Sequence, residues 1–227
     1  MYNKNNKKLS TTTLKVFEKL WDEIVFGKFY PGERLVESEL MLRFNTYRAS
    51  IREALHELVN SGLAIHLPNK GVSVLKLEMD EVEKIYALRV EIEQLAIKWL
   101  KLPFSEDQLK VLVSIQNTHS KAIQENDFRM IFNSNNDFHS YIYSHCNNNF
   151  LKEMIKNLEQ KSLTIRFHSY VNKDFLKVVE NEHIQIIESI KRNDRTKLKQ
   201  LIQVHINQAK NNFTNNNRTR HLVFESA

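Results

Sequence analysis

The sequence predicts a mainly α-helical protein, in which an N-terminal winged helix-turn-helix, residues 1–76, precedes an all-helical bundle of about six helices, residues 77–227. Two observations lead to this prediction. Residues 35–75 combine two short amphipathic helices with a turn-rich hairpin. From residue 77 onward the chain has one proline, no glycine and apolar residues at helical spacing, which favours a helical bundle over a sheet.

A first helix is expected from about Ser10 to Phe26, because apolar residues recur there at the 3.6-residue helical period. Gly27 and the pair Pro31-Gly32 end it. Its apolar face is expected to form core rather than a site. That face consists of Leu14, Phe17, Trp21, Ile24 and Val25.

The next two helices are short, and a two-stranded hairpin follows them. The later of these two short helices is expected to end at Gly62, because glycine readily adopts the left-handed conformation that ends helices. Residues 63–66 and 72–75 are partly alternating and flank the turn residues Pro68 and Gly71. The apolar stripes of the two helices are Leu40, Met41 and Phe44 in the first, and Ile51, Leu55, Leu58 and Val59 in the second.

The polar face of the second of these helices is suited to a DNA groove. Arg48 and Arg52 lie one turn apart and project from the same side, near the start of the helix. Arginine at that place in a recognition helix can pair with guanine or hold a phosphate. Lys70 at the hairpin tip would add a phosphate or minor-groove contact. The alternative is an ordinary helical hairpin with solvated charges.

The charge distribution agrees with a DNA-facing N-terminal domain. Lysine and arginine outnumber the acidic residues by 33 to 27 in the whole chain. Residues 1–76 hold 12 basic and 8 acidic side chains, so about two-thirds of the net charge lies in one-third of the chain. This asymmetry alone is weak support, because a mildly basic protein would show it too.

The single cysteine, Cys146, cannot form an internal disulfide, which indicates a reducing compartment. No apolar run approaches the length that a membrane span needs, and the N-terminal segment MYNKNNKKLS is polar. We therefore expect a cytoplasmic protein without membrane contact.

Several N-terminal segments together form a known pattern. They are Pro31-Gly32-Glu33-Arg34-Leu35, Glu37-Ser38-Glu39-Leu40, Arg48-Ala49-Ser50-Ile51-Arg52-Glu53-Ala54-Leu55, Leu58, Gly62-Leu63 and Lys70-Gly71-Val72. In order and spacing they resemble the GntR-type bacterial transcription regulators. The resemblance implies that Arg48 and Arg52 contact operator DNA and that Gly71 at the wing tip enters the minor groove. The expected DNA-binding residues are Arg34, Tyr47, Arg48, Ser50, Arg52, Lys70 and Gly71.

Two residues depart from the pattern of that family. Tyr47 stands where serine or threonine is usual, and Ser50 replaces a common proline. Tyrosine cannot cap a helix as serine does. Asn45 or Thr46 is therefore expected to cap the helix that carries Arg48 and Arg52.

Six further helices are expected after residue 77. Ser105 with Gln108 forms a capping box at the start of one, and Asp127 can cap the next. Residues 1–9 and the asparagine-rich tail from Asn211 are expected to be loosely ordered. The expected helices span residues 80–100, 105–124, 127–146, 150–170, 174–192 and 194–212.

Three histidines, His139, His183 and His205, lie on the apolar faces of three separate helices of this bundle. Any one of them would most often be an ordinary core histidine, and that alternative remains open. Buried imidazoles need partners, however, and a shared metal ion would satisfy all three. Asn135 lies one turn before His139 and adds an oxygen donor on the same face.

The second half of the chain carries a second set of matching residues. They are Asn135-Asn136-Asp137-Phe138-His139, Glu182-His183, His205 and Leu88-Arg89-Val90-Glu91-Ile92-Glu93. This set resembles the FCD ligand-binding domain of the FadR branch of the same family. The resemblance implies a divalent metal in the bundle core, bound by His139, His183 and His205, whose open positions hold a small organic acid. The aspartate of the family is replaced here by Asn135.

The amide of Asn135 is a poorer ligand than a carboxylate, so metal affinity should fall while attraction for an anionic effector rises. Zinc or nickel suits imidazole ligands best. Arg89 is expected to clamp the carboxylate of the effector, with a salt bridge to Glu93 as the alternative. Arg166 is a weaker candidate of the same kind.

We therefore expect a ligand-responsive transcription regulator, a repressor that binds palindromic operator DNA as a homodimer, with a small carboxylate effector. The helical domain could instead sense the metal itself or only dimerise. A helical metal-dependent hydrolase is the alternative from another class. It lacks a general base, because Asn135 cannot serve and Glu182 is expected to point away from the histidines, so we expect no enzymatic activity.

Overall fold

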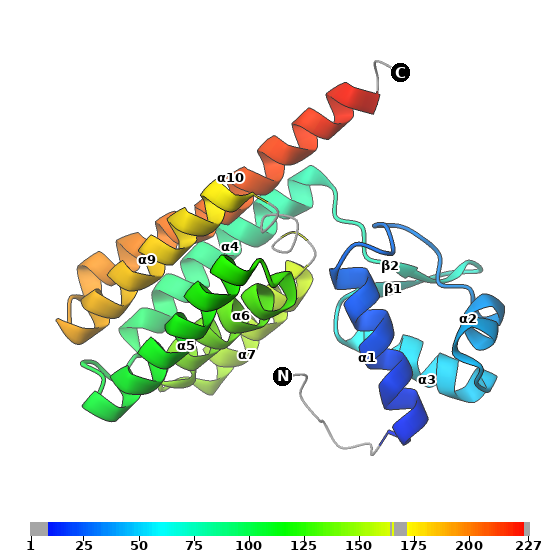
Figure 1. Ribbon diagram of the computed structural model, residues 1–227, viewed down its shortest axis with the longest axis horizontal. Coiled ribbons are helices and arrows are strands. Elements are labelled where there is room, and N and C mark those ends of the chain that lie inside the picture. The colour runs from blue at the N-terminus through cyan, green and yellow to red at the C-terminus, as the bar shows by residue number, and fades with distance from the viewer. Residues whose placement is uncertain (1–8, 164, 166–171, 225–227) are drawn as a thin grey trace. The chain divides into compact units, whose positions relative to one another are not determined.

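The computed structural model describes residues 9–163, 165 and 172–224. It confirms the predicted fold class, because helices dominate the described residues and their single sheet has two strands (Figure 1). The chain divides into two compact units, Met1–Glu78 and Met79–Ala227. No described helix combines the length with the apolar character that a membrane span requires.

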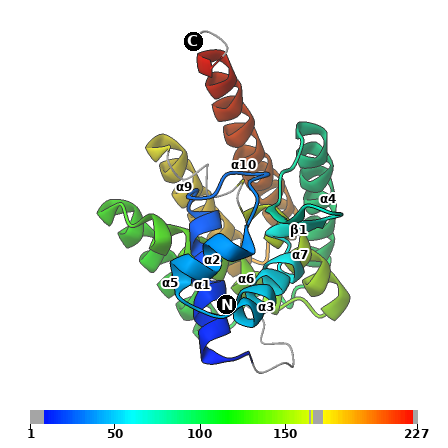
Figure 2. The ribbon, with the colours of Figure 1, turned by 90° about the vertical axis from the view of Figure 1, so that its right-hand side faces the viewer.

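The first unit consists of three helices and a hairpin. The helices are α1 (Thr11–Val25), α2 (Glu37–Phe44) and α3 (Arg48–Asn60), and the strands are β1 (Ala64–Leu67) and β2 (Gly71–Val74). Ser10 starts α1 by accepting a hydrogen bond from the backbone N–H of Thr13 at 3.1 Å. Both α1 and α2 pack against α3 (Figure 2). The core between them includes the fully buried Leu20, Ile51 and Leu58.

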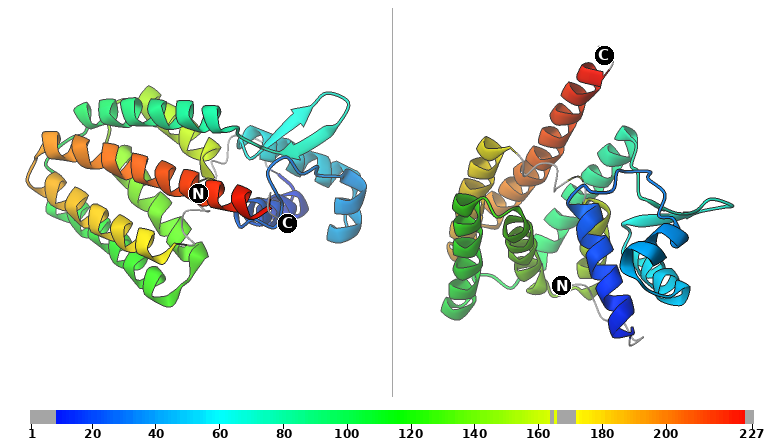
Figure 3. Two further views of the ribbon diagram at one scale, coloured as in Figure 1. Left: turned by 90° about the horizontal axis from the view of Figure 1, so that it is seen from above. Right: turned by 45° about the vertical axis from the view of Figure 1, so that its right-hand side comes forward.

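The hairpin forms the wing that the sequence predicts. Its strands pair antiparallel, from Ala64 opposite Val74 to Leu67 opposite Gly71, and Figure 3 shows the turn extending away from the helices of its own unit. The preceding loop joins the sheet, because the N–H of Leu35 donates to the carbonyl of Val72 at 2.9 Å. Arg34 pairs with Ser73 in an isolated bridge, which fixes it beside the wing.

The junction between α2 and α3 corrects the expected cap. Asn45 adopts a left-handed conformation, φ 44°, at the end of α2, so it ends one helix rather than starting the next. Tyr47 is the N-cap residue of α3, and no side chain caps that helix. The prediction that Asn45 or Thr46 would cap α3 is therefore wrong.

The second unit is a bundle of long helices, with Ser105 forming the predicted capping box and Asp127 capping α6. In it α5 packs against α6 and α9, while α4 packs against α7 and α10, and α9 lies along α10 (Figures 1 and 3). Phe132, Phe138, Ile186 and Ile202 fill its core. The described helices are α4 (Met79–Lys98), α5 (Glu106–Glu125), α6 (Phe128–Ser144), α7 (Asn149–Lys161), α9 (Lys173–Lys191) and α10 (Arg195–Phe224).

Two helix ends differ from the prediction. Helix α7 ends at Lys161, whereas the sequence suggested about Tyr170, which lies outside the described residues. Helix α10 continues to Phe224, well beyond the expected end near Asn212. Its sequence contains no glycine or proline to stop it, and the asparagine-rich segment that suggested a loose tail is compatible with helix.

Arg195 fastens the start of α10 to the end of α4. Its Nη1 donates to the carbonyl oxygen of Ile97 at 2.6 Å, and its Nη2 donates to that of Leu100 at 2.8 Å. Ile97 lies in the last turn of α4 and Leu100 lies two residues past its end, a region where backbone carbonyls lack helical partners and a cation is favourable.

Replacing Arg195 by alanine is expected to lower the free energy of unfolding by about 2 kcal/mol, because two charge-assisted hydrogen bonds are lost. Urea unfolding followed by far-ultraviolet circular dichroism measures this change. The matched control is Arg192→Ala, which removes an exposed ion pair with Glu188 and should cost less than about 0.5 kcal/mol. Equal losses in the two variants would contradict the fastening role of Arg195.

Candidate nucleic-acid interface and metal centre

The exposed face of α3 carries two arginines that share one carboxylate. Nε of Arg52 donates to both oxygens of Glu37, at 2.9 and 3.1 Å, and Nε of Arg48 lies 3.7 Å from Oε2 of the same residue. The side chains of Arg48 and Arg52 are 61% and 66% exposed. Exposed ion pairs are worth little in water, so both guanidinium groups can exchange Glu37 for a phosphate or a base.

A hollow of about 530 Å³ runs between the helices and the wing of this unit. It brings together four of the predicted DNA-binding residues, namely Arg34, Arg48, Arg52 and Gly71. The backbone of Gly71 has φ +79°, a conformation that side-chain-bearing residues rarely adopt, and a Cβ there would lie 4.0 Å from Nη2 of Arg34. Tyr47 and Lys70 are exposed and Ser50 is half-buried, and none of these three lines the hollow.

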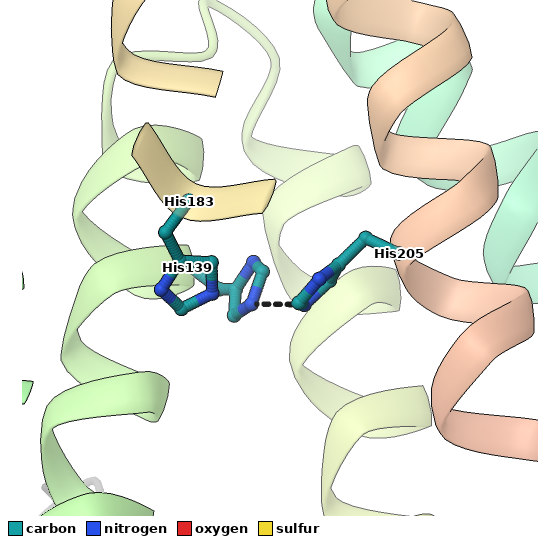
Figure 4. Close-up of side chains that lie close together, drawn as sticks. All are labelled: His139, His183 and His205. Carbon is teal, nitrogen blue, oxygen red and sulfur yellow. Dashed lines mark hydrogen bonds between the residues drawn. The ribbon is translucent and has the colours of Figure 1, made fainter. Parts of the chain in front are cut away.

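The helical unit brings three predicted metal ligands together in its interior. His139 on α6, His183 on α9 and His205 on α10 are 3%, 0% and 8% exposed. One ligand nitrogen from each lies within 4.8 Å of the other two. Figure 4 shows the three rings converging, with Nε2 of His139 3.0 Å from Nε2 of His205. That spacing is short enough for a shared ion.

Hydrogen bonds on the far side of two rings fix their protons. Nδ1 of His183 lies 2.8 Å from Oε1 of Gln116, an amide oxygen that can only accept. The amide nitrogen of Gln116 meanwhile donates to Ser120, which supports this orientation of the amide. Nδ1 of His205 lies 2.8 Å from the carboxylate of Glu182. Both rings therefore donate through Nδ1, which leaves Nε2 as the nitrogen that faces the cluster, as in metal-ligating histidines.

The chemistry of His183 fits a metal ligand. Its Nε2 is buried and has no hydrogen-bond partner among the residues that the structure describes. Burial lowers the pKa of His183 well below 6.5, and the neighbouring histidines lower it further. The ring is therefore neutral at neutral pH, with an unsatisfied lone pair that a cation would satisfy.

Asn135 is 3% exposed and lies one helical turn before His139 on α6. Residues four apart on a helix share a face, so the amide belongs to the same side of α6 as the imidazole of His139. An amide oxygen is a weaker donor than a carboxylate, and the set as a whole carries no formal negative charge.

Three residues of this region were misjudged or missed from sequence. Glu182 was expected to point away from the histidines, which is wrong, because its carboxylate accepts from His205 of α10. Gln116 and His119 on α5 were not identified, although both are buried, at 4% and 0% exposure. The buried residues of α5 recur at helical spacing, and that periodicity could have revealed the pair.

Arg89 takes part in a buried network in the same unit. Its Nε donates to Oε1 of Glu93 at 2.9 Å, so the predicted alternative, a salt bridge, is present. The hydroxyl of Tyr143 donates to the other oxygen of Glu93 at 2.7 Å. Burial lowers the pKa of Arg89, but Glu93, Tyr86 and Glu159 together outweigh it and raise that pKa above its ordinary value. Arg166, the weaker effector candidate, lies outside the described residues.

A winged helix-turn-helix joined to an all-helical unit is the architecture of a DNA-binding regulator. The model of the bacterial regulatory proteins of the gntR family matches residues 12–74, and the FCD domain model matches residues 84–208. The chain therefore belongs to the GntR family and carries an FCD domain. The resemblances to the GntR-type regulators and to the FCD domain are confirmed.

Relatives of known name agree with this assignment. The uncharacterized HTH-type transcriptional regulator YdhC of Bacillus subtilis is 28% identical over 195 residues, covering 86% of this chain and 87% of YdhC. The HTH-type transcriptional repressor RspR of Escherichia coli is 24% identical over 194 residues, covering 85% and 84%. The fold matches that of E. coli McbR/YncC with a TM-score of 0.74 and 22% identity, over 91% of this chain and 99% of that one. The protein is a transcription regulator and not an enzyme.

Lowering the pH is expected to destabilise the helical unit through His119. Burial lowers the pKa of His119 to about 4, below its ordinary value of 6.5, so the unfolded chain binds a proton in this window that the folded chain does not. The free energy of unfolding should therefore fall as the pH drops from 6.5 towards 4, by at most about 3 kcal/mol from this residue. Urea unfolding of chelator-treated protein across that range measures the effect.

The matched variants are His119→Phe, which should show a shallower pH dependence, and His56→Phe, which changes a histidine that is 71% exposed and should leave the slope unaltered. His183 contributes in the same direction as His119, so the slope should shrink in His119→Phe without vanishing. A slope identical to that of the wild type would contradict the neutral state of His119.

Proposed function

We propose that this transcription regulator is a homodimeric repressor of the FadR branch, which acts in the cytoplasm and whose hold on operator DNA is controlled by a small carboxylate bound at a divalent metal. The observation that carries the proposal is the convergence of three imidazole nitrogens within 4.8 Å, with the buried Nε2 of His183 lacking a partner among the described residues. The repressor activity named for RspR, a relative that matches most of the chain, supports the direction of control.

In this proposal α3 and the wing contact the operator. Arg48 and Arg52 would contact base edges or phosphates from α3, with Tyr47 and Ser50 in the same first turn, while Arg34, Lys70 and Gly71 would contact the backbone or the minor groove. A two-fold dimer would place two recognition helices about one DNA turn apart, so the operator should be roughly palindromic.

The proposed metal ligands are His139, His183 and His205, with Asn135 as a weaker fourth. A divalent ion held there, zinc or nickel, supplies open positions that accept a carboxylate oxygen. Tyr143 lies one turn after His139 on α6 and bonds Glu93, which in turn holds Arg89. The charge of Arg89, fixed through this chain of contacts, would then assist in attracting the acid.

Control follows from linkage between two sites on one chain. If the carboxylate and the operator favour different arrangements of the dimer, each ligand must weaken the binding of the other by the same factor. The helical unit has two alternative roles, namely sensing of the metal itself and dimerisation alone. Metal analysis together with effector screening distinguishes these roles from binding of a carboxylate.

Replacing Arg48 and Arg52 by alanine is expected to reduce operator affinity by roughly 100-fold or more, because each bidentate arginine contact is worth about 1–3 kcal/mol. The probe is a duplex that the wild-type protein selects from a random pool, and fluorescence anisotropy at physiological salt measures the affinity. The matched control, Arg192→Ala, removes an exposed arginine from the helical unit and should bind as the wild type does. If the double variant keeps its circular dichroism spectrum and binds the duplex with wild-type affinity, α3 does not contact the operator.

Protein purified without chelator is expected to carry stoichiometric metal, and replacing His139, His183 and His205 together by alanine should abolish it. Inductively coupled plasma mass spectrometry measures both. The control His56→Ala changes an exposed histidine and should retain the metal. Asn135→Asp restores a carboxylate and should tighten metal binding. Metal-free wild-type protein that also fails to take up added zinc or nickel would favour the dimerisation role.

A further inference from the structure

Helix α5 contributes a fourth buried histidine beside the three of the proposed metal centre. His119 is 0% exposed, and its ring centroid lies 5.2 Å from that of His183. Its Nδ1 lies 2.9 Å from Oγ of Ser134, the residue directly before Asn135 on α6. The ring is therefore held in the same interior layer of the helical unit as the proposed ligands.

Ser134 determines which nitrogen of His119 carries the proton. The hydroxyl of Ser134 has one hydrogen, which it donates to the backbone carbonyls of Met130 at 2.6 Å and Ile131 at 3.2 Å. Towards the imidazole, Oγ can therefore only accept, so Nδ1 of His119 is the N–H donor. The ring is 0% exposed and forms no ion pair with a described residue, so a second proton would leave an uncompensated buried charge. Nε2 consequently bears a lone pair.

That lone pair has no hydrogen-bond partner among the described residues, although the atom is buried. Leaving a buried acceptor unsatisfied destabilises the folded state, which points to a donor supplied by a bound molecule. Direct coordination fits less well. The nitrogens of His139, His183 and His205 form a set within 4.8 Å of one another, and His119 is not part of that set.

We propose that Nε2 of His119 accepts a hydrogen bond from the effector, so that the helical unit selects 2-hydroxy acids over simple carboxylic acids. The inference rests on the proposed function, because the carboxylate is taken to bind at the histidine cluster. In a 2-hydroxy acid the hydroxyl is on the carbon next to the carboxylate, and His119 lies next to His183, one of the proposed metal ligands. An acid without the hydroxyl would leave Nε2 unpaired, and a site built to bond a hydroxyl discriminates strongly against an analogue that lacks it.

The test compares acids that differ only by the hydroxyl, propionate with lactate and succinate with malate. Isothermal titration calorimetry is carried out on the zinc-loaded full chain. The wild type should bind the hydroxy acid of a pair at least about 10-fold more tightly than its partner. His119→Phe keeps a ring of similar size and should bind zinc as the wild type does, while binding the two members of each pair alike.

Two further variants sharpen the test. His119→Gln restores a buried oxygen acceptor, so it should recover part of the preference and serves if the phenylalanine variant folds poorly. Ser134→Ala removes the acceptor that fixes the proton on Nδ1, so it should weaken the preference without loss of zinc. Melting temperatures of the zinc-loaded variants without acid verify the fold.

The outcomes separate this inference from the function on which it rests. A preference that survives unchanged in His119→Phe would show that the metal alone chelates the hydroxyl, and would overturn the role of His119. Loss of zinc from that variant would overturn it as well, by making His119 a ligand. Acid binding without any preference in the wild type removes this inference alone, whereas no binding of any of the four acids removes the proposed carboxylate site together with it.

Discussion

The histidine cluster depends on the acceptors that take its Nδ1 protons. His183 donates to Gln116 and His205 donates to Glu182, and both bonds are 2.8 Å long. Without these acceptors the rings could change tautomer or turn, and their Nε2 lone pairs would no longer face a common point. The packing of α5, α9 and α10 buries the three imidazole rings. It also brings Gln116 and Glu182 to the rings and so fixes the protons of His183 and His205 on Nδ1.

The arginines of the two units show that burial determines whether an arginine can exchange its ion-pair partner. The ion pair between Arg52 and Glu37 is largely exposed, so water screens it and a DNA phosphate can replace the carboxylate at small cost. Arg89 and Glu93 are 3% and 1% exposed, and Tyr143 completes their network. Separating a buried pair is expensive, so Arg89 provides a fixed charge, while Arg52 provides an exchangeable one.

Much of each site could be predicted from local patterns. The arginines of α3 and the histidines of the bundle lie at helical spacing, and the matching motifs assign them to two families of domains. Glu182 was misread because its partner lies on α10, which helical periodicity within α9 cannot reveal. Gln116 and His119 were missed because neither belongs to a motif, although both lie on the buried side of α5.

The sequence by itself determined the order of helices and strands, the DNA-reading motif and the three histidines, because periodicity and turn residues act over a few positions of the chain. The tertiary structure alone decided which atoms meet. Arg34 lies beside Gly71 because the preceding loop pairs with β2. His119 lies beside His183 because α5 packs against α9. Such contacts join residues far apart in the chain, and their hydrogen bonds fix the tautomers on which the chemistry of the helical unit depends.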